Sequence, residues 1–202
     1  MLNFSEAVDF RHAARHFIKD KEMDQKDLEF ILNSAIKAPS SLNLEHWEFV
    51  VVKDKETKKK LRAASFDQEQ VEDASAVVVI LTKRQKLLDP KSDEVMKLIK
   101  ERIPEHSIHI AVDFLESFPS DEAFTAWSKA QGYIAASFIM LAAASLEIDS
   151  CPMEGFVSDQ VLEVIDRSPE EYVGSLIVPL GYRSQPPYDR VRASFDEKVT
   201  II

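Results

Sequence analysis

The sequence contains little glycine and almost no cysteine. Its 202 residues include four glycines and a single cysteine, Cys151. One cysteine excludes an internal disulfide and a multi-cysteine zinc site, and it fits a reducing cytoplasm. No two glycines have the spacing of a phosphate loop or of a dinucleotide fingerprint. A classical P-loop or Rossmann enzyme is therefore excluded.

Long uncharged stretches are also scarce. The longest covers residues 130–146 and is interrupted by Gln131, Gly132 and serines, so it predicts a buried helix rather than a membrane span. Near the start, Glu6 and Asp9 stand where a signal peptide would need an apolar core. We therefore expect a cytoplasmic protein.

Basic charge is in deficit. The chain has 25 Lys and Arg against 35 Asp and Glu, which gives a net charge of −10. A surface this acidic repels nucleic-acid phosphates and anionic lipid, so we expect neither nucleic-acid nor membrane binding. An anionic ligand would need a local cluster of arginines.

Hydropathy and turn residues predict one α+β domain over residues 1–202, since no internal repeat or linker interrupts the chain. The helices are expected over residues 24–37, 55–64, 120–146 and 158–165, with Asp24 capping the first and Ser120 or Asp121 capping the third. Further helical segments in 85–119 are expected to break near Pro90, Pro104 and Pro119. Strands are expected over residues 47–52, 76–81 and 175–180. The apolar end, Val199 to Ile202, follows a polar arm and predicts pairing with a sheet edge, either of this chain or of a partner subunit.

Two basic motifs can bind a phosphate. Arg11 and Arg15 are four residues apart, so they can share one face of a helix end and offer planar donors. Arg190 and Arg192 alternate near the C-terminus, where an extended segment would point them the same way. The alternatives are a solvated basic face for the first pair and a solubilising tail for the second.

Two loop motifs are candidates for a ligand site. Ala-Pro-Ser-Ser-Leu-Asn at residues 38–43 offers hydroxyls, an amide and free N–H groups, although plain turn chemistry would also explain it. Cys-Pro-Met-Glu-Gly-Phe at residues 151–156 includes Gly155, which permits close approach of backbone to a flat ligand. Its alternative is a loop that simply leaves a buried helix.

Metal or nucleophilic chemistry is poorly supported. His106 and His109 have helical spacing, with Asp113 four residues further on. However, no HExxH motif or further strong ligand completes a metal site. Cys151 has no Lys or His near it in sequence to lower its pKa, so packing is its expected role. We expect no metal and no catalytic side chain.

Taken in order, these segments resemble the FMN-dependent nitroreductase family. The resemblance rests on the arginine-rich start, the 38–43 motif before a Trp-initiated strand, the 151–156 motif and the basic tail. It implies a three-layer α/β/α fold with a mainly antiparallel sheet. It also implies a homodimer with FMN at the subunit interface and a C-terminal strand exchanged between subunits.

The resemblance also implies roles for particular residues. Arg11 and the Arg190/Arg192 pair would bind the FMN phosphate, and Arg15 would face the pyrimidine edge of the flavin. The backbone N–H groups of Glu154 and Gly155 would lie near flavin N5 and O4. The full implied cofactor site comprises Arg11, His12, Ala13, Arg15, Asp67, Gln68, Gln70, Tyr133, Pro152, Met153, Glu154, Gly155, Arg190 and Arg192, with Pro39, Ser40, Ser41 and Asn43 from the partner.

The implied activity is hydride transfer carried by the flavin. NADH or NADPH would reduce flavin N5, and a nitroaromatic, quinone or related acceptor would then take its place. This explains why no catalytic triad is present. The alternatives are a flavin-binding or storage protein without NAD(P)H turnover, and a cofactor-free interaction domain.

The sequence departs from the family pattern near the flavin. Ala13 replaces a phosphate-binding serine, and Asp67 and Gln70 stand where relatives have an asparagine and often a lysine. A carboxylate at the electron-rich flavin edge would lower the potential, and Gln68 could replace that contact. The resemblance fails over residues 85–119, so the acceptor stays open. The nicotinamide preference also stays open, since no ribose-reading acidic residue can be placed without a Rossmann unit.

Overall fold

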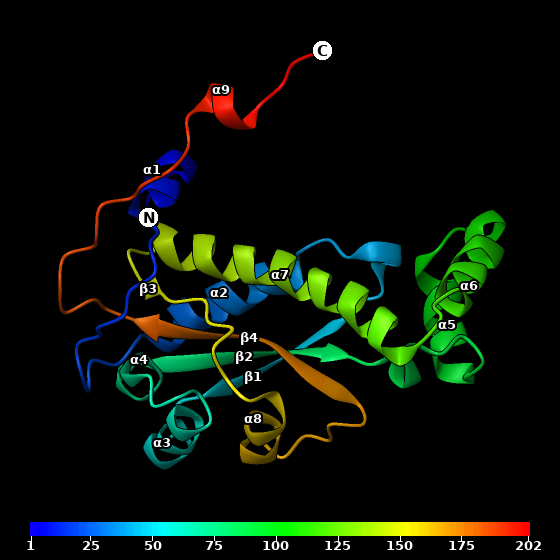
Figure 1. Cartoon of the computed structure of the whole chain (residues 1–202), viewed down its shortest axis with the longest axis horizontal. Coiled ribbons are helices and arrows are strands. Elements are labelled where there is room, and N and C mark those ends of the chain that lie inside the picture. The colour runs from blue at the N-terminus through cyan, green and yellow to red at the C-terminus, as the bar shows by residue number, and fades with distance from the viewer.

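The computed structural model describes residues 1–202 and is built around one four-stranded antiparallel sheet (Figure 1). The strand order is β1-β2-β4-β3. The strands are β1 (Trp47–Val52), β2 (Ala76–Lys83), β3 (Asp149–Ser150) and β4 (Tyr172–Gly181). All three strand pairings are antiparallel, so the predicted α+β class with a mainly antiparallel sheet is confirmed.

The central strand β2 is apolar on both faces because helices cover both sides of the sheet. Val78 and Ile80 face one cluster of buried side chains, whereas Val77 and Val79 face another. Successive side chains of a strand point to opposite faces, so both faces of this strand lie in the core. The sheet is therefore the middle of three layers.

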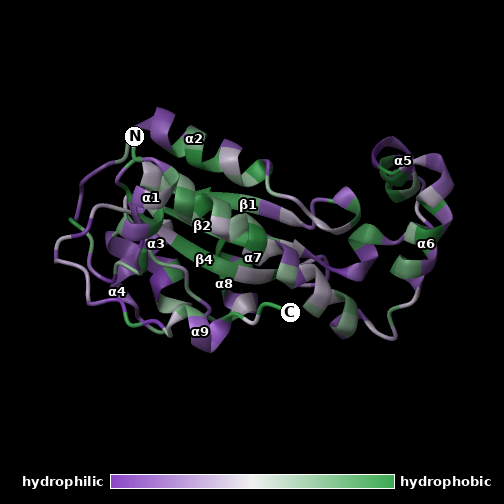
Figure 2. Ribbon diagram, turned by 90° about the horizontal axis from the view of Figure 1, so that it is seen from above, coloured by the Kyte–Doolittle hydropathy of each residue, from purple (hydrophilic) through white to green (hydrophobic).

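The first helical layer consists of α2 (Gln25–Ile36) and the long α7 (Asp121–Ser145) (Figure 2). Asp24 and Ser120 cap these helices, as the sequence predicts. Helix α7 approaches the sheet closely at Gly132, where an added Cβ would lie 3.1 Å from Ser175 Oγ. The structure describes no helix that is long and apolar enough to cross a membrane.

The second helical layer lies on the other face of the sheet (Figure 1). It contains α3 (Lys55–Ala63), α4 (Glu69–Asp73) and α8 (Ser158–Val164). Leu61, Val161 and Leu162 from this layer are fully buried against the sheet. Cys151 packs in the same cluster, and burial raises the pKa of its thiol to about 11, which confirms its expected packing role.

Residues 85–119 form a separate lobe at one end of the molecule (Figure 1). Its elements are the short turns Gln85–Leu88 and Glu105–Ser107 and the helices α5 (Asp93–Arg102) and α6 (Ile108–Glu116). The breaks fall near Pro90, Pro104 and Pro119, as expected. The lobe packs on the start of α7 through an aromatic cluster in which Phe118 and Trp127 lie 5.1 Å apart.

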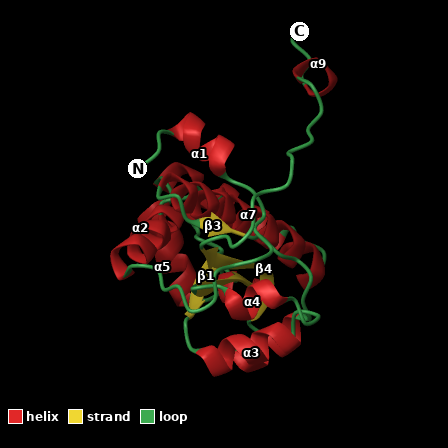
Figure 3. Ribbon diagram, turned by 90° about the vertical axis from the view of Figure 1, so that its left-hand side faces the viewer, coloured by secondary structure: helices red, strands yellow, loops and turns green.

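Both ends of the chain lie outside the layers (Figure 3). Helix α1 (Phe4–Phe10) was not predicted, although Asn3 and Glu6 form a capping box at its start. The tail carries α9 (Phe195–Lys198) and leaves Ile201 and Ile202 85% and 117% exposed. Pairing of this tail with a partner's sheet therefore stays a prediction.

Helix α7 also leaves an apolar face open. Because the sequence of this helix is apolar on every face, it predicts a helix that is covered on all sides or that lies at a subunit interface. In the single chain, Ile134 and Phe138 are 37% and 38% exposed, so one chain does not cover the helix completely.

Candidate functional site

The N-terminal motif lies beside the loop that follows β3. Arg11 ends helix α1, and the chain then runs extended through Ala13, which forms a parallel bridge with Ser150. The backbone N–H of Ala14 donates to the Ser150 carbonyl over 3.0 Å. The expectation that Arg11 and Arg15 share a helix face is therefore wrong, because α1 stops at Phe10.

The two basic motifs meet in space although they are separated by most of the chain. Arg11, Arg15, Arg190 and Arg192 line one hollow of about 330 Å³. His12, Ala13, Tyr188 and Asp189 complete its lining. The pKa of Arg11 is lowered by burial and then by the charges of Arg190 and Arg192. An anion in the hollow would relieve this repulsion.

Arg190 is also a structural anchor. Its guanidinium donates to the carbonyls of Val8 and Asp9, both over 2.9 Å, and to that of Arg11. These contacts satisfy carbonyls at the end of α1 and tie the C-terminal arm to the N-terminal segment. Arg192 donates only to the carbonyl of its neighbour Val191, so its guanidinium keeps more donors for a ligand.

His12 belongs to a network that sequence reasoning missed. Its Nε2 lies 3.7 Å from Oδ1 of Asp149, and Nη1 of Arg183 lies 3.3 Å from its Nδ1. The Arg183 backbone N–H donates to Asp149 Oδ2 over 2.8 Å. The network joins the segment after α1 to the ends of β3 and β4. Asp149 and Arg183 carry no motif signal, because only folding brings them to His12.

The 152–155 loop presents backbone donors. Met153 exchanges two hydrogen bonds with Ile177 of β4, over 2.9 and 3.1 Å, which fixes the loop on the sheet. The Met153 side chain is buried in the core, so it contributes to a site through its backbone. The N–H groups of Glu154 and Gly155 donate no hydrogen bond within the chain. Pro152 precedes them and is half-buried.

Gln68 connects this loop to the turn before α4. Its Nε2 donates to the carbonyls of Gly155 and Ser65 over 2.9 and 3.1 Å. Gln70 is buried and donates through Nε2 to Gln68 Oε1 over 3.0 Å, so it positions Gln68. A Cβ at Gly155 would lie 3.0 Å from Gln68 Nε2, which explains the glycine there.

Asp67 and Phe66 occupy strained backbone at the same turn. Their φ angles are 57° and 52°, in the left-handed region that costs a non-glycine residue energy. The Asp67 carboxylate is highly exposed and lies 3.9 Å from Arg62 Nε. The Phe66 ring is 67% exposed beside Gly155, a placement that sequence reasoning did not use.

Tyr133 reaches the loop from helix α7. Its hydroxyl donates to Glu154 Oε1 over 2.7 Å. Burial and then the hydrogen bond to Glu154 raise the pKa of Tyr133 to about 12, so the hydroxyl keeps its proton at neutral pH. Tyr133 therefore contacts the 152–155 loop, another segment of the predicted cofactor site.

The 39–43 motif contacts helix α7 at a different point from the N-terminus. Ser41 N–H donates to Gln131 Oε1 over 3.0 Å, whereas the N-terminus contacts α7 through a bond from Leu2 to Ser145. Gln131 and Ser145 are about 14 residues, or about 21 Å, apart along the helix axis. None of Pro39, Ser40, Ser41 and Asn43 lines the arginine hollow of the same chain.

A buried histidine holds this motif in place. His46 is fully buried, with Nε2 3.2 Å from the Ser41 carbonyl and Nδ1 3.2 Å from Ser128 Oγ. The loop needs support because Leu42 and Asn43 have φ angles of 55° and 52°. Burial lowers the pKa of His46 to about 4. Sequence reasoning assigned this histidine no role.

Acid should weaken the fold through His46. Its pKa is about 4 when folded and 6.5 when unfolded, so below pH 6.5 the unfolded chain binds the extra proton. We expect the free energy of unfolding to fall by about 3 kcal/mol between pH 6.5 and 4 from this group, since one pKa unit is worth about 1.4 kcal/mol. Urea unfolding across this range measures the slope.

The matched variants are His46→Gln and, as a control, exposed His106→Gln. The first should flatten the slope and the second should leave it unchanged. Equal slopes for His46→Gln and the unmodified protein would contradict the assignment.

Comparison with known proteins identifies the family. The nitroreductase family model matches residues 8–182, so the chain belongs to the nitroreductase family. A Staphylococcus haemolyticus protein with the name "Putative NAD(P)H nitroreductase" is 34% identical, covering 97% of this chain and 95% of that protein. The expected family and α+β fold are thereby confirmed.

Solved structures share the fold. The crystal structure of a Staphylococcus epidermidis protein, titled as an NAD(P)H:FMN oxidoreductase, has a TM-score of 0.84 and 22% identity, covering 100% of this chain and 97% of that one. An Exiguobacterium sibiricum nitroreductase solved with FMN has a TM-score of 0.83 and 23% identity, covering 100% and 98%. At these identities the likeness concerns the fold.

Proposed function

We propose that this protein is an FMN-dependent NAD(P)H oxidoreductase of the nitroreductase type. The observation that carries the proposal is the meeting of three guanidinium groups, Arg11, Arg190 and Arg192, in one hollow. The adjoining Ala13 is bridged to Ser150, shortly before a loop with two free backbone N–H donors. The family membership and the FMN-bound E. sibiricum relative support the choice of cofactor.

The residues present suit FMN. A phosphate needs concentrated positive charge in a chain of net charge −10, and Arg11 and Arg192 supply it at the hollow. Ala13 offers no hydroxyl there, so the arginines do more of the work. A flat ring can approach this loop at its free backbone N–H groups, those of Glu154 and Gly155. Bound FMN would supply the redox chemistry by accepting and donating a hydride.

The chain's own groups would orient and tune the ring. The N–H groups of Glu154 and Gly155 would donate to its polar edge, and Arg15 would place a cation near its pyrimidine side. Gln68 and Gln70 hold the loop in register through Gly155. The Asp67 carboxylate points toward Arg62 and solvent, so we propose no flavin contact for Asp67.

A second copy would complete the site. Pro39, Ser40, Ser41 and Asn43 do not line the arginine hollow of their own chain, so we infer that they reach the flavin of the partner. The open apolar face with Ile134 and Phe138, together with the exposed tail, offers surface for a homodimer. We propose that residues 1–202 act as one such domain in the cytoplasm.

The relatives support a choice of electron donor. We propose NADH or NADPH as the donor, because the relatives' names give NAD(P)H. A nitroaromatic, quinone or related compound would be the acceptor. Phe66 stands exposed beside Gly155, where its ring can stack on a flat donor or acceptor. The rival function is flavin storage without turnover.

The visible spectrum of the freshly purified protein tests the proposal. We expect flavin absorption bands that bleach within seconds to minutes when NADPH or NADH is added without oxygen, and that return with a quinone or nitroaromatic. Bands that persist with both nucleotides would favour storage. A protein that stays colourless after reconstitution with FMN would contradict the proposed cofactor.

A further inference from the structure

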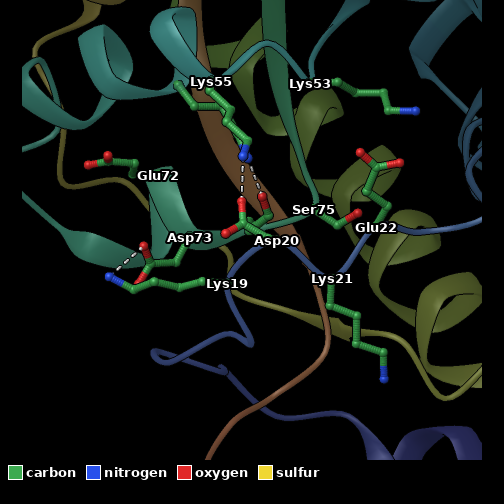
Figure 4. Close-up of a pocket in the computed structure, with 11 residues that line it drawn as sticks. Lys19, Asp20, Lys21, Glu22, Lys53, Lys55, Glu72, Asp73 and Ser75 are labelled. Carbon is green, nitrogen blue, oxygen red and sulfur yellow. Dashed lines mark hydrogen bonds and ion pairs between the residues drawn. The ribbon is translucent and has the colours of Figure 1, made fainter.

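A second charged hollow lies on a different part of the surface, with a volume of about 300 Å³ (Figure 4). It is bordered by residues 19–22, by the chain between β1 and α3, and by the end of α4. Its lining is almost entirely polar and comprises Lys19, Asp20, Lys21, Glu22, Lys53, Lys55, Lys58, Glu72, Asp73, Ala74 and Ser75.

Most carboxylates around the hollow already have cationic partners. Asp20 lies 2.5 Å from Lys55 Nζ, and Asp73 lies 3.4 Å from Lys19 Nζ. Glu72 pairs with Arg62, which is outside the lining, over 3.0 Å. Only Glu22 has no ion pair. The negative charge of the lining is therefore largely neutralised by neighbouring side chains.

Three lysines of the lining have no carboxylate partner. Lys53 forms no ion pair, and Lys21 Nζ instead lies 3.8 Å above the ring of Tyr182. Lys58 is only 7% exposed and donates a single hydrogen bond, to the Ala74 carbonyl over 2.5 Å. The lining therefore holds five lysines against four carboxylates, a surplus of one positive charge in a chain that is strongly acidic overall.

Lys58 is the unusual member. An ammonium group has three donors, and a buried cation is costly unless it is paired and hydrogen-bonded. Here one donor is satisfied by a neutral carbonyl and no carboxylate lies within ion-pair distance. Burial is also the main cause that lowers the pKa of Lys58. Anionic oxygens would satisfy the remaining donors.

We propose that this hollow is a second anion site that binds a phosphate group through Lys58 and Lys53. Lysine binds phosphate as a point charge, and the small polar hollow suits a compact, highly charged group better than an apolar one. The phosphate can belong to a small free compound or to the ribose phosphate that distinguishes NADPH from NADH. Only the NADPH alternative rests on the proposed function.

Calorimetric titration with inorganic phosphate, at constant ionic strength, tests the site in the purified full-length protein. We expect saturable binding that Lys53→Gln weakens about fivefold to tenfold. Lys58→Met should weaken it further, although burial makes this variant less certain to fold, so Lys53→Gln decides the test. Lys59→Gln is the matched control. Lys59 lies on the same helix as Lys58, and its exposed charge is outside the hollow.

Titration with NADP⁺ and NAD⁺ separates the two sources. If Lys53→Gln weakens NADP⁺ binding and spares NAD⁺, the nucleotide supplies the phosphate. If both nucleotides bind equally well to the variant while phosphate binding is lost, a free phosphate compound is the ligand. The site would be overturned by absence of saturable phosphate binding, or by equal weakening in Lys53→Gln and Lys59→Gln. Neither result depends on flavin reduction by NADPH, which tests the proposed function separately.

Discussion

Replacing Arg11 and Arg192 together by glutamine should weaken FMN binding by at least about 100-fold. A hydrogen bond between charged groups contributes about 1.5–3 kcal/mol, and each 1.4 kcal/mol is a factor of ten in affinity. These two arginines line the same hollow, and neither anchors helix α1 as Arg190 does. Quenching of flavin fluorescence on titration with the apoprotein measures the dissociation constant.

The control for this experiment is Arg167→Gln, which removes an exposed arginine that donates only to the neighbouring Asp166 carbonyl. It should leave FMN affinity unchanged. Arg190→Gln should lower both FMN affinity and melting temperature, because it also releases the end of α1. Unaltered FMN binding in the Arg11/Arg192 double variant would show that the phosphate lies elsewhere.

Deleting residues 199–202 should raise the dissociation constant of the dimer by about 100-fold or more. The segment contains Val199, Ile201 and Ile202, which are all exposed in the single chain. Burying one such side chain contributes about 1.5–3 kcal/mol, so docking two or three on a partner would account for this change. Sedimentation velocity over a range of protein concentrations measures the dimer dissociation constant.

A matched variant distinguishes side-chain burial from chain length. Ile201→Ser and Ile202→Ser together keep the length and remove most of the apolar area, so they should weaken the dimer nearly as much as the deletion. Thr200→Ser should have little effect. A dimer that is equally stable after the deletion would rule out the exchanged C-terminal strand, while leaving the arginine hollow untested.

Local sequence patterns predicted the secondary structure well where a helix or strand depends only on residues near it in the sequence. The capping residues Asp24 and Ser120 and the breaks near Pro90, Pro104 and Pro119 all agree with the structure. The apolar strand 76–81 makes up most of β2, which begins at the same residue and ends at Lys83. These features depend on neighbours in sequence, such as a cap and the N–H groups that it satisfies.

The short helix α1 shows where such reasoning failed. It covers only Phe4–Phe10. The expectation that Arg11 and Arg15 share a helix face required helical backbone at these residues, which α1 does not reach. The chain instead becomes extended at Ala13, because a bridge to Ser150 holds it against β3. A contact with a residue so far along the chain leaves no local pattern in the sequence.

By itself, the sequence determined the α+β class, the family and the residue types that suit a phosphate and a flat ring. Those conclusions need only composition, local periodicity and motifs in a given order. Tertiary structure alone decided which motifs meet: Arg11 with Arg192, Gln68 with Gly155, and Tyr133 with Glu154. It also decided that the lysines around Lys58 surround a hollow. Such meetings are set by how the sheet and its two helical layers pack, a property of the whole chain rather than of any one segment.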